Sequence, residues 1–333
     1  MIRELQIRHF KSVKALDLKC NRVNVFVGEP NTGKSNILET IGLLHLFADQ
    51  HEDFHGNDIS SMLRISQWTQ LFHNQDLSQP VSIAADKTRV ELRHDDERKQ
   101  IDVYTGKDKF ASLRPDRLYV IGERPPSVRF ALYRFRKRDE FPSRETRFVV
   151  PPDAPNLMEV IRSRRELLES LRGLLGELNL NFVFDLTSRT IRLERQTSAG
   201  EGVRETLYLP YTSLSESLQR TIFNLAVVLG NRNAVIALEE PEVHMFPPHI
   251  KKLAELIAKD NSNQYFISTY SPYLLISLIE KAPKNELNIF LTYLEHNETK
   301  VRMLTNEQKE EVLDMGSDVF FNLDKFLEEL KQG

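Results

Sequence analysis

A glycine-rich stretch near the N-terminus has the residue types and spacing of a phosphate-binding loop. Gly28, Gly33, Lys34 and Ser35 fit the pattern G-x-x-x-x-G-K-[ST], with an apolar run before it and helix-like sequence after it. The two glycines allow a backbone path that turns successive N–H groups toward phosphate oxygens, and the helix N-terminus adds partial positive charge. The alternative is a chance glycine-rich turn, which these flanks disfavour. We therefore predict nucleotide binding.

The side chains of this loop predict how it would hold ATP and Mg²⁺. Lys34 would place its ammonium on the β- and γ-phosphates as a catalytic residue, and the Ser35 hydroxyl would ligate Mg²⁺. The other nucleotide-binding candidates in the loop and the first helical turn are Gly28, Thr32, Gly33 and Asn36.

Two adjacent carboxylates follow a second apolar run. Residues 234–238 are typical of a parallel strand buried on both faces, and Glu239 and Glu240 come directly after them. Unpaired carboxylates there would cost several kcal/mol, and a Mg²⁺–nucleotide site would supply their partners. Glu239 would hold the water shell of the metal, and Glu240 would orient and deprotonate the attacking water. Alternatively, both lie in solvent and cap the following helix.

Composition limits the class of protein. The 333 residues are 40% hydrophobic and 28% charged, which is typical of a globular chain with one large domain or two ordinary ones. The net charge of −3 excludes an overall cationic field, and the single cysteine excludes an internal disulfide or a cysteine-based zinc site. The N-terminus lacks the apolar core of a signal peptide, and no apolar run approaches the ~20 residues of a membrane span. We expect a cytoplasmic protein that makes no membrane contact.

Alternating and periodic runs predict the elements that position these residues. Strands at 2–8 and 13–18 precede the P-loop and indicate a sheet with an antiparallel N-terminal part. Further strands are expected at 181–186, 190–195, 265–268 and 287–294, and helices from Lys34 and at 213–229, 248–258 and 319–330. We expect an α/β P-loop ATPase head, with a mixed sheet flanked by helices, at 1–45 and 211–333. An inserted lobe would occupy 46–210, with a β-meander at 81–122, a basic stretch at 107–147 and a helical arm at 156–180.

The order of the motifs resembles the ABC/SMC-type ATPase heads, and most closely the predicted ATPases grouped with the RecF and overcoming-lysogenization-defect (OLD) proteins. It consists of the P-loop, a long insertion, a Ser-rich helix start at 214–217, the run Glu-Glu-Pro-Glu at 239–242 and Ser-Thr-Tyr-Ser-Pro at 268–272. The opening 7–12, Ile-Arg-His-Phe-Lys-Ser, is similar to the first-strand sequence of that group. The resemblance covers 1–45 and 211–275 well and the middle poorly.

This resemblance implies an ATP-dependent head-to-head homodimer. Ser215 matches the signature sequence and would contact the γ-phosphate bound to the other subunit, although an ordinary helix N-cap is the alternative. Asn31 would help to arrange the γ-phosphate and water. Members of the group often act in DNA maintenance or phage defence, and some carry a TOPRIM nuclease domain. Only about sixty residues follow Ser271, so a nuclease or effector would be a separate chain.

Three departures from the family pattern bear on the rate of hydrolysis. Glu239 replaces the usual aspartate, and Glu216 and Ser217 replace the glycines of the signature. Tyr270 replaces the switch histidine, and a tyrosine cannot be a cationic γ-phosphate partner at neutral pH. We expect a slow Mg²⁺-dependent ATPase; the alternative is a nucleotide-gated scaffold or regulatory protein that scarcely turns over. The glutamine that links Mg²⁺ to the insertion in such heads could be Gln67, Gln70 or Gln75.

A basic stretch is the remaining functional candidate. Residues 129–138, Arg-Phe-Ala-Leu-Tyr-Arg-Phe-Arg-Lys-Arg, interleave cations with aromatic rings. In a strand, Arg134, Arg136 and Arg138 would share one face, which suits contact with a DNA or RNA backbone and leaves the rings for base stacking. A solvated strand face, or a surface for an acidic protein, is the alternative.

Overall fold

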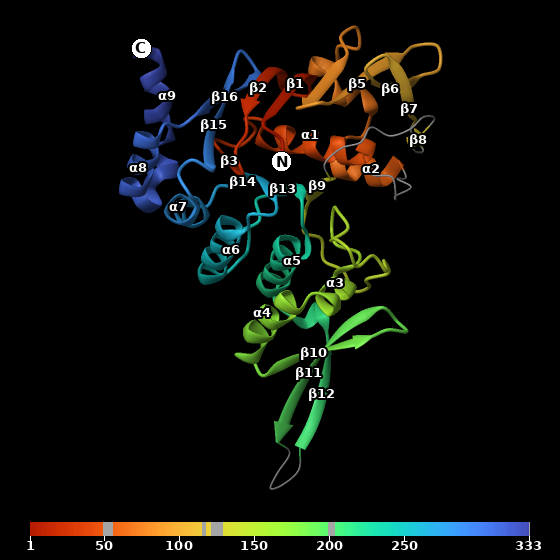
Figure 1. Cartoon of the computed structure of the whole chain (residues 1–333), viewed down its shortest axis with the longest axis vertical. Coiled ribbons are helices and arrows are strands. Elements are labelled where there is room, and N and C mark those ends of the chain that lie inside the picture. Colours follow the sequence, from red (N-terminus) through yellow and green to blue (C-terminus); the bar gives the residue numbers. More distant parts are fainter. Residues whose placement is uncertain (49–55, 115–117, 121–128, 199–203, 333) are drawn as a thin grey trace. The chain divides into compact units, whose positions relative to one another are not determined.

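The computed structural model describes residues 1–48, 56–114, 118–120, 129–198 and 204–332. The chain forms two compact units, whose elements are labelled in Figure 1. The first comprises Met1–Leu132, Asn233–Glu240 and Ile257–Gly333, and the second comprises Tyr133–Arg232 and Pro241–Leu256. These units do not follow the boundaries expected from the sequence, because the segment 46–132 belongs to the same unit as the P-loop rather than to one lobe with 133–210.

A six-stranded sheet in the first unit positions the candidate residues. Its strand order is β16 (Glu298–Met303), β15, β3, β14, β13 and β9 (Arg129–Tyr133). The P-loop strand β3 (Val23–Val27) runs parallel to β14 (Gln264–Ser268) and β15 (Leu287–Glu295), and β14 is also parallel to β13 (Ala234–Glu239). Every residue of β3 and β14 is buried, as expected for strands covered on both faces. Because parallel strands end at one edge, the segments that follow β3, β13 and β14 meet there.

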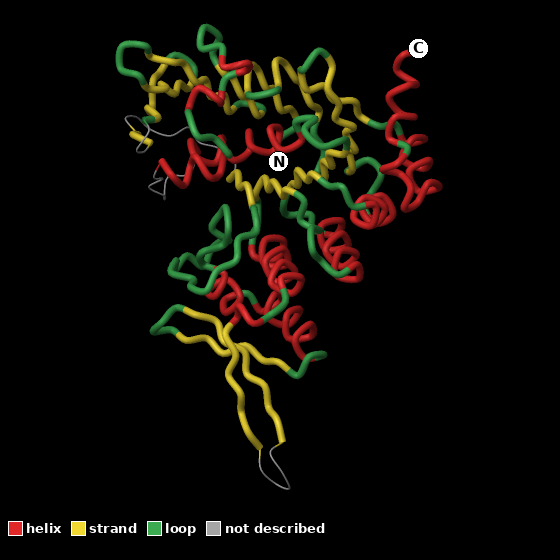
Figure 2. The backbone as a smooth tube through the Cα atoms, turned by 180° about the vertical axis from the view of Figure 1, so that it is seen from behind, coloured by secondary structure: helices red, strands yellow, loops and turns green. Residues whose placement is uncertain are grey.

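The second sheet of this unit has seven antiparallel strands. Its order is β2 (Val13–Lys19), β1 (Glu4–Phe10), β4 (Val81–Ala85), β5 (Thr88–Asp95), β6 (Gln100–Thr105), β7 (Asp108–Leu113) and β8 (Leu118–Val120). The predicted antiparallel N-terminal strands and the β-meander are confirmed as far as residue 120, and β4 joins them by pairing with β1. Helix α1 (Lys34–Ala48) runs between the two sheets (Figure 2), and its apolar residues share one core with both.

The first unit also contains C-terminal elements and several short helices. The sequence did not predict strand β16 (Glu298–Met303), which pairs antiparallel with β15, or helix α8 (Asn306–Met315). The expected closing helix is two elements, η4 (Gly316–Phe321) and α9 (Leu323–Gln332). The first unit also contains α2 (Gly56–Leu63), η1 (Trp68–Leu71), η2 (His73–Gln75) and α7 (Pro272–Lys281). Helix α6 (Pro247–Lys259) belongs to the second unit as far as Leu256 and to the first from Ile257. Among the described helices, none combines the length and the apolar character needed to cross a membrane.

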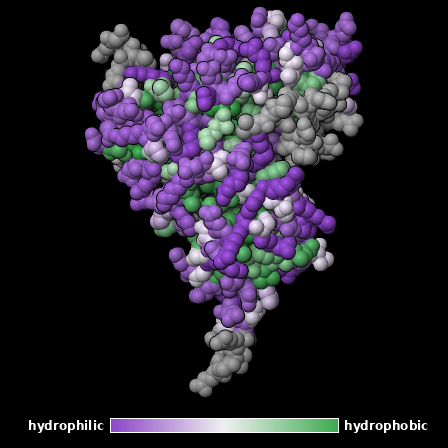
Figure 3. Space-filling view, viewed as in Figure 1, coloured by the Kyte–Doolittle hydropathy of each residue, from purple (hydrophilic) through white to green (hydrophobic). Residues whose placement is uncertain are grey.

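The second unit combines helices with a three-stranded antiparallel sheet. Its helices are α3 (Leu157–Ser163), α4 (Arg165–Gly176) and α5 (Glu216–Gly230), with the short η3 (Tyr211–Ser213). The sheet is β10 (Leu180–Asp185), β11 (Thr190–Ser198) and β12 (Arg204–Pro210). The expected helical arm is therefore two helices, interrupted where Arg164 is extended. Figure 3 shows apolar side chains gathered over the β10–β11 region of a mostly hydrophilic face.

The strand predicted for the basic residues 134–138 is wrong. Strand β9 (Arg129–Tyr133) ends before them, and its residues from Phe130 onward are buried. A longer strand would carry guanidinium groups into this buried layer, at a cost that a pair or solvent must offset. Instead the Arg134 N–H donates to the Pro152 carbonyl (2.9 Å), and Arg138 pairs with Asp153 (2.8 Å). The parts of the basic stretch at 115–117 and 121–128 lie outside the described residues.

Candidate nucleotide-binding site

The loop between β3 and α1 has the backbone that the sequence pattern requires. Gly28 has a φ of +144° and Gly33 a φ of +96°, and Asn31 is also left-handed at +62°. A Cβ on Gly28 would lie 2.2 Å from the Thr292 carbonyl oxygen, and one on Gly33 would lie 2.0 Å from Thr299 Oγ1. Both positions therefore exclude side chains on conformational and on steric grounds.

A chain of hydroxyl groups fixes the loop to the neighbouring strands. Thr299 Oγ1 donates to the Thr32 carbonyl (3.0 Å) and lies 2.7 Å from Ser12 Oγ. Asn36 Nδ2 in turn donates to Ser12 Oγ (2.6 Å). The amide of Asn36 is thus directed to the β1–β2 turn, and its role toward a nucleotide stays a prediction. Thr299 was not expected here because its strand, β16, was not predicted. Thr292 lies on the predicted strand β15, but nothing in the sequence pattern links it to the loop. Ser12 lies in the opening stretch that carries the resemblance.

The P-loop lysine is buried against its own loop. Lys34 is only 3% exposed, and its Nζ donates to the carbonyl oxygens of Gly28 (2.8 Å) and Glu29 (2.7 Å). Burial lowers its pKa to about 8, and the charges of Glu240 and Glu29 oppose this shift. The Thr32 hydroxyl donates to the Glu29 carbonyl (2.8 Å). Phosphate oxygens would be stronger, charged acceptors for the same ammonium.

Tyr270 lies against this ammonium. Lys34 Nζ is 4.2 Å from the centroid of the Tyr270 ring, which is a cation–π contact. Burial raises the pKa of the phenol, and the charges of Glu240 and Glu239 add to the shift. The hydroxyl is therefore neutral at physiological pH and can donate a hydrogen bond, but it carries no positive charge.

The two carboxylates stand where β13 ends. The Glu239 side chain is 4% exposed and pairs with Arg64, with 2.5 Å between Oε2 and Nη2. Glu240 has a left-handed φ of +44°, and its N–H donates to the Ser268 carbonyl (3.0 Å). Burial raises the pKa of Glu240, the charge of Glu239 adds to this, and Lys34 and Arg64 oppose it. A carboxylate of raised pKa is better matched to accepting a proton near neutral pH.

The residues at this edge fit a Mg²⁺–nucleotide rather than a metal held by protein alone. Among the described residues, no group of three or more His, Cys, Asp or Glu side chains could hold a metal ion. Mg²⁺ usually takes one or two protein ligands and completes its shell with phosphates and waters. Ser35 and Glu239 can be those protein ligands. Ser268 Oγ, at the end of β14, is buried and makes no hydrogen bond within the described chain. Ser268 is the first residue of the run 268–272 that carries the resemblance, but that pattern assigns no role to its hydroxyl.

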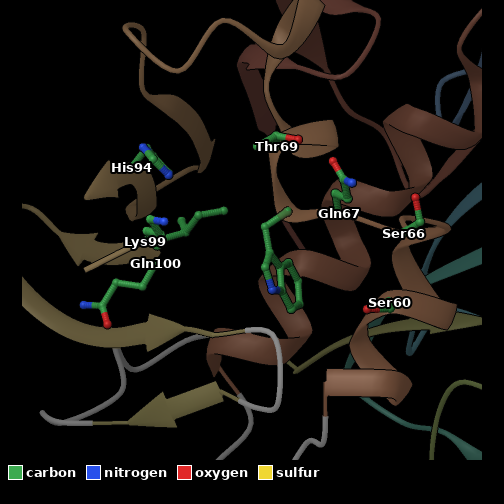
Figure 4. A pocket seen from close by; sticks show the side chains of 9 residues that line it. Ser60, Ser66, Gln67, Thr69, His94, Lys99 and Gln100 are labelled. Atoms are coloured by element: carbon green, nitrogen blue, oxygen red, sulfur yellow. The ribbon is translucent and has the colours of Figure 1, made fainter. Parts of the chain in front are cut away.

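The segment after α2 connects the site to a cavity. Arg64 has a φ of +50°. Ser66 and Gln67, which follow Ile65, lie on one side of a cavity of about 350 Å³, opposite His94 and Lys99 (Figure 4). Trp68, Thr69, Gln100, Ile101 and Ser60 complete the lining. Of the glutamines proposed to reach Mg²⁺, Gln67 lines this cavity, Gln70 accepts the Ser66 N–H (2.8 Å) and Gln75 accepts the Thr69 hydroxyl (3.4 Å). Which of them, if any, approaches the metal stays a prediction.

Ser215 lies in the second unit as the N-cap of α5. Its Oγ accepts the Leu218 N–H (3.3 Å), and the residue is exposed. The hydroxyl therefore makes the ordinary capping bond, while contact with a nucleotide on another subunit stays a prediction. Glu216 pairs with Arg220 and with His244, each at 2.8 Å. The Ser217 hydroxyl accepts the Phe246 N–H (3.1 Å), so the residues at the signature glycine positions have structural partners.

Comparison with known proteins adds the following findings. A family model described as "AAA domain, putative AbiEii toxin, Type IV TA system" matches residues 23–277. No curated protein sequence matches the chain. An SMC head bound to the C-terminal winged-helix domain of ScpA is 13% identical, with 93% of this chain and 99% of that chain covered and a TM-score of 0.52. The SMC head domain from Thermotoga maritima is 10% identical, with 91% and 99% covered and a TM-score of 0.43.

The fold is therefore that of an SMC head, a P-loop nucleotide-binding ATPase fold. This confirms the expected α/β architecture and the resemblance to ABC/SMC-type heads. The narrower resemblance to the RecF and OLD proteins stays a prediction.

Proposed function

The chain belongs to the AAA-domain family whose description reads "putative AbiEii toxin, Type IV TA system", and we propose that it binds ATP with Mg²⁺ and hydrolyses it slowly. One observation carries the proposal. The P-loop, with Lys34 buried in it, and the carboxylates of Glu239 and Glu240 lie at the same edge of one sheet. The two side chains are close enough that the charge of Glu240 raises the pKa of Lys34 and the charge of Lys34 lowers the pKa of Glu240.

In this proposal each residue has a separate task. The loop N–H groups and Lys34 bind the β- and γ-phosphates, and Ser35 and Glu239 hold the metal, directly or through water. When bound, Mg²⁺ would neutralise part of the negative charge that develops on the phosphates. Glu240 orients the attacking water and accepts its proton. The neutral Tyr270 at the position of a switch histidine is the reason that we propose a low rate.

We further propose that ATP drives a head-to-head homodimer that gates a bound partner. The exposed Ser215 at the N-terminus of α5 supports this, because its surface is accessible to a second copy. The family description names a toxin of a TA system, and one solved SMC head is bound to ScpA, so a separate effector chain is part of the proposal. Contact with DNA through 129–138, a role in DNA repair or phage defence, and a cytoplasmic location also remain proposals.

A second candidate is a scaffold or regulatory protein that binds ATP without appreciable turnover. Two observations favour it: the ring of Tyr270 covers Lys34, and the hydroxyl of Ser217 accepts a bond from Phe246. Dimerisation by ATP without phosphate release would support this alternative over the enzyme.

The test measures phosphate release and light scattering in parallel, with Mg-ATP, for wild type and Glu240→Gln. The enzyme proposal expects Glu240→Gln to lose at least about a hundredfold in rate and to accumulate as a dimer, because the general base is lost while binding is kept. Glu280→Gln on the exposed side of α7 is the matched control and should behave as wild type. Monomers without phosphate release in every variant would refute both the enzyme and the dimer.

A further inference from the structure

Arg64 contacts a carboxylate that is assigned to the metal. Its Nη2 lies 2.5 Å from Glu239 Oε2. We propose that Arg64 competes with Mg²⁺ for Glu239 and thereby sets how strongly nucleotide binding depends on the metal. This inference rests on the proposed ATP site and adds a residue that neither the P-loop pattern nor the carboxylate pair predicts.

The two members of this ion pair are exposed to very different degrees. The Glu239 side chain is 4% exposed, whereas the Arg64 side chain is 53% exposed. A guanidinium that is half in water can leave the pair at low cost, whereas loss of a cation destabilises a buried carboxylate unless another cation replaces it. Bound Mg²⁺ would be such a replacement, and the more exposed Arg64 would be the partner that leaves the pair.

The backbone holds Arg64 in position for this exchange. Its φ of +50° is left-handed, which turns the chain sharply at the end of α2. The next residue, Ile65, is buried, and its N–H donates to the Ser60 carbonyl (3.0 Å). The Gln70 side chain then accepts the N–H of Ser66 (2.8 Å), so the segment after Arg64 is also fixed. Arg64 is therefore a positioning residue, presented to Glu239 by a constrained turn.

Charge determines the expected effect. Without metal, ATP brings several negative charges toward Glu239 and Glu240, and Arg64 offsets part of the repulsion. With metal, the positive charge of Arg64 opposes the incoming Mg²⁺. Removing that one charge should therefore weaken the binding of metal-free nucleotide and strengthen the binding of Mg²⁺, each by about tenfold for charges several ångströms apart at a partly exposed site.

The experiment titrates the non-hydrolysable analogue AMP-PNP by calorimetry, in EDTA and over a series of free Mg²⁺ concentrations. Arg64→Gln should bind metal-free AMP-PNP about tenfold more weakly and need about tenfold less Mg²⁺ for half-saturation. Arg64→Lys keeps the charge and should remain close to wild type. Arg93→Gln removes a similarly exposed arginine paired with Glu91 on β5, and it should change neither quantity.

The outcomes separate this inference from the proposed function. If wild type binds AMP-PNP neither with nor without Mg²⁺, the ATP site itself is wrong. If wild type binds with a clear Mg²⁺ dependence and a folded Arg64→Gln shows the same dependence, only the role of Arg64 is refuted. Weaker Mg²⁺ binding in Arg64→Gln would also refute competition, because Arg64 would then be supporting Glu239 as a metal ligand. Circular dichroism and thermal unfolding establish that each variant is folded.

Discussion

At the scale of single residues, the site differs from the expected pattern mainly at Tyr270. Its ring lies 4.2 Å from the Lys34 ammonium, and its hydroxyl is neutral at physiological pH because burial raises the pKa of the phenol. A histidine there would titrate near neutrality and could present positive charge to a γ-phosphate. The residue that most limits the proposed rate is thus one that contacts the P-loop lysine itself.

We predict that Tyr270→His increases phosphate release about tenfold, since a cationic partner stabilises charge on the γ-phosphate in the transition state. Tyr270→Phe keeps a ring over Lys34 and should retain nearly the wild-type rate. Tyr273→His, on the exposed side of α7, is the control for adding a histidine nearby. Steady-state phosphate release measures all four proteins. An unchanged or lower rate in Tyr270→His would show that Tyr270 does not limit turnover.

At the scale of elements, a buried polar cluster ties β6 to β7 in the antiparallel sheet. Asp102 accepts hydrogen bonds from Gln100 (2.7 Å) and Ser112 (3.0 Å) and pairs with Lys109 (2.7 Å). Burial alone would raise the pKa of Asp102, but these three partners outweigh it and hold the pKa below its usual value. The charged form is therefore the one that stabilises the sheet.

The sign of the pH dependence follows from the lowered pKa of Asp102. Its stabilisation is fully present above the unfolded pKa of about 4 and declines as pH falls below that value toward the folded pKa. We predict that Asp102→Asn lowers the free energy of unfolding by about 2 kcal/mol at pH 7 and by less near pH 3. Urea unfolding at the two pH values measures this. Asp108→Asn, an exposed neighbour on β7, should show no such loss, and an equal loss at both pH values for Asp102→Asn would contradict the assignment.

At the scale of the whole molecule, the question is whether the chain dimerises on ATP through α5. Ser215 has two separable roles: its oxygen caps the helix, and in the proposed dimer it contacts a γ-phosphate on the other subunit. Aspartate caps a helix as well as serine does, but its charge would repel a phosphate. Substitution at this position can therefore keep the fold and remove the dimer.

We predict that Ser215→Asp, introduced into Glu240→Gln, leaves thermal stability within about 0.5 kcal/mol but abolishes the ATP-driven dimer. Ser215→Ala should cost about 1 kcal/mol of stability through the lost cap. Thr305→Asp introduces an aspartate at the threonine N-cap of α8 and should leave dimerisation intact. Light scattering with Mg-ATP gives the outcome. A dimer that persists in the Ser215→Asp variant would place the interface elsewhere.

Several parts of the fold and site are predictable because the determining residues are close together in the chain. The conformations of Gly28 and Gly33 follow from a local backbone path that only glycine adopts readily, and the burial of β13 and β14 follows from continuous apolar runs. The strand expected to continue through residues 134–138 ends at Tyr133, because alternation of residue types does not reveal that β9 is buried and ends there.

The sequence by itself determined the P-loop and the position of the two carboxylates that we propose to serve it, since each motif is contiguous and the backbone conformation it requires is local. Tertiary structure alone decided which distant residues complete the site. Arg64 reaches Glu239 across 175 positions, and Thr299 reaches the Thr32 carbonyl across 267. Such contacts depend on how strands pair and where a turn directs a side chain, and no local periodicity or spacing encodes them.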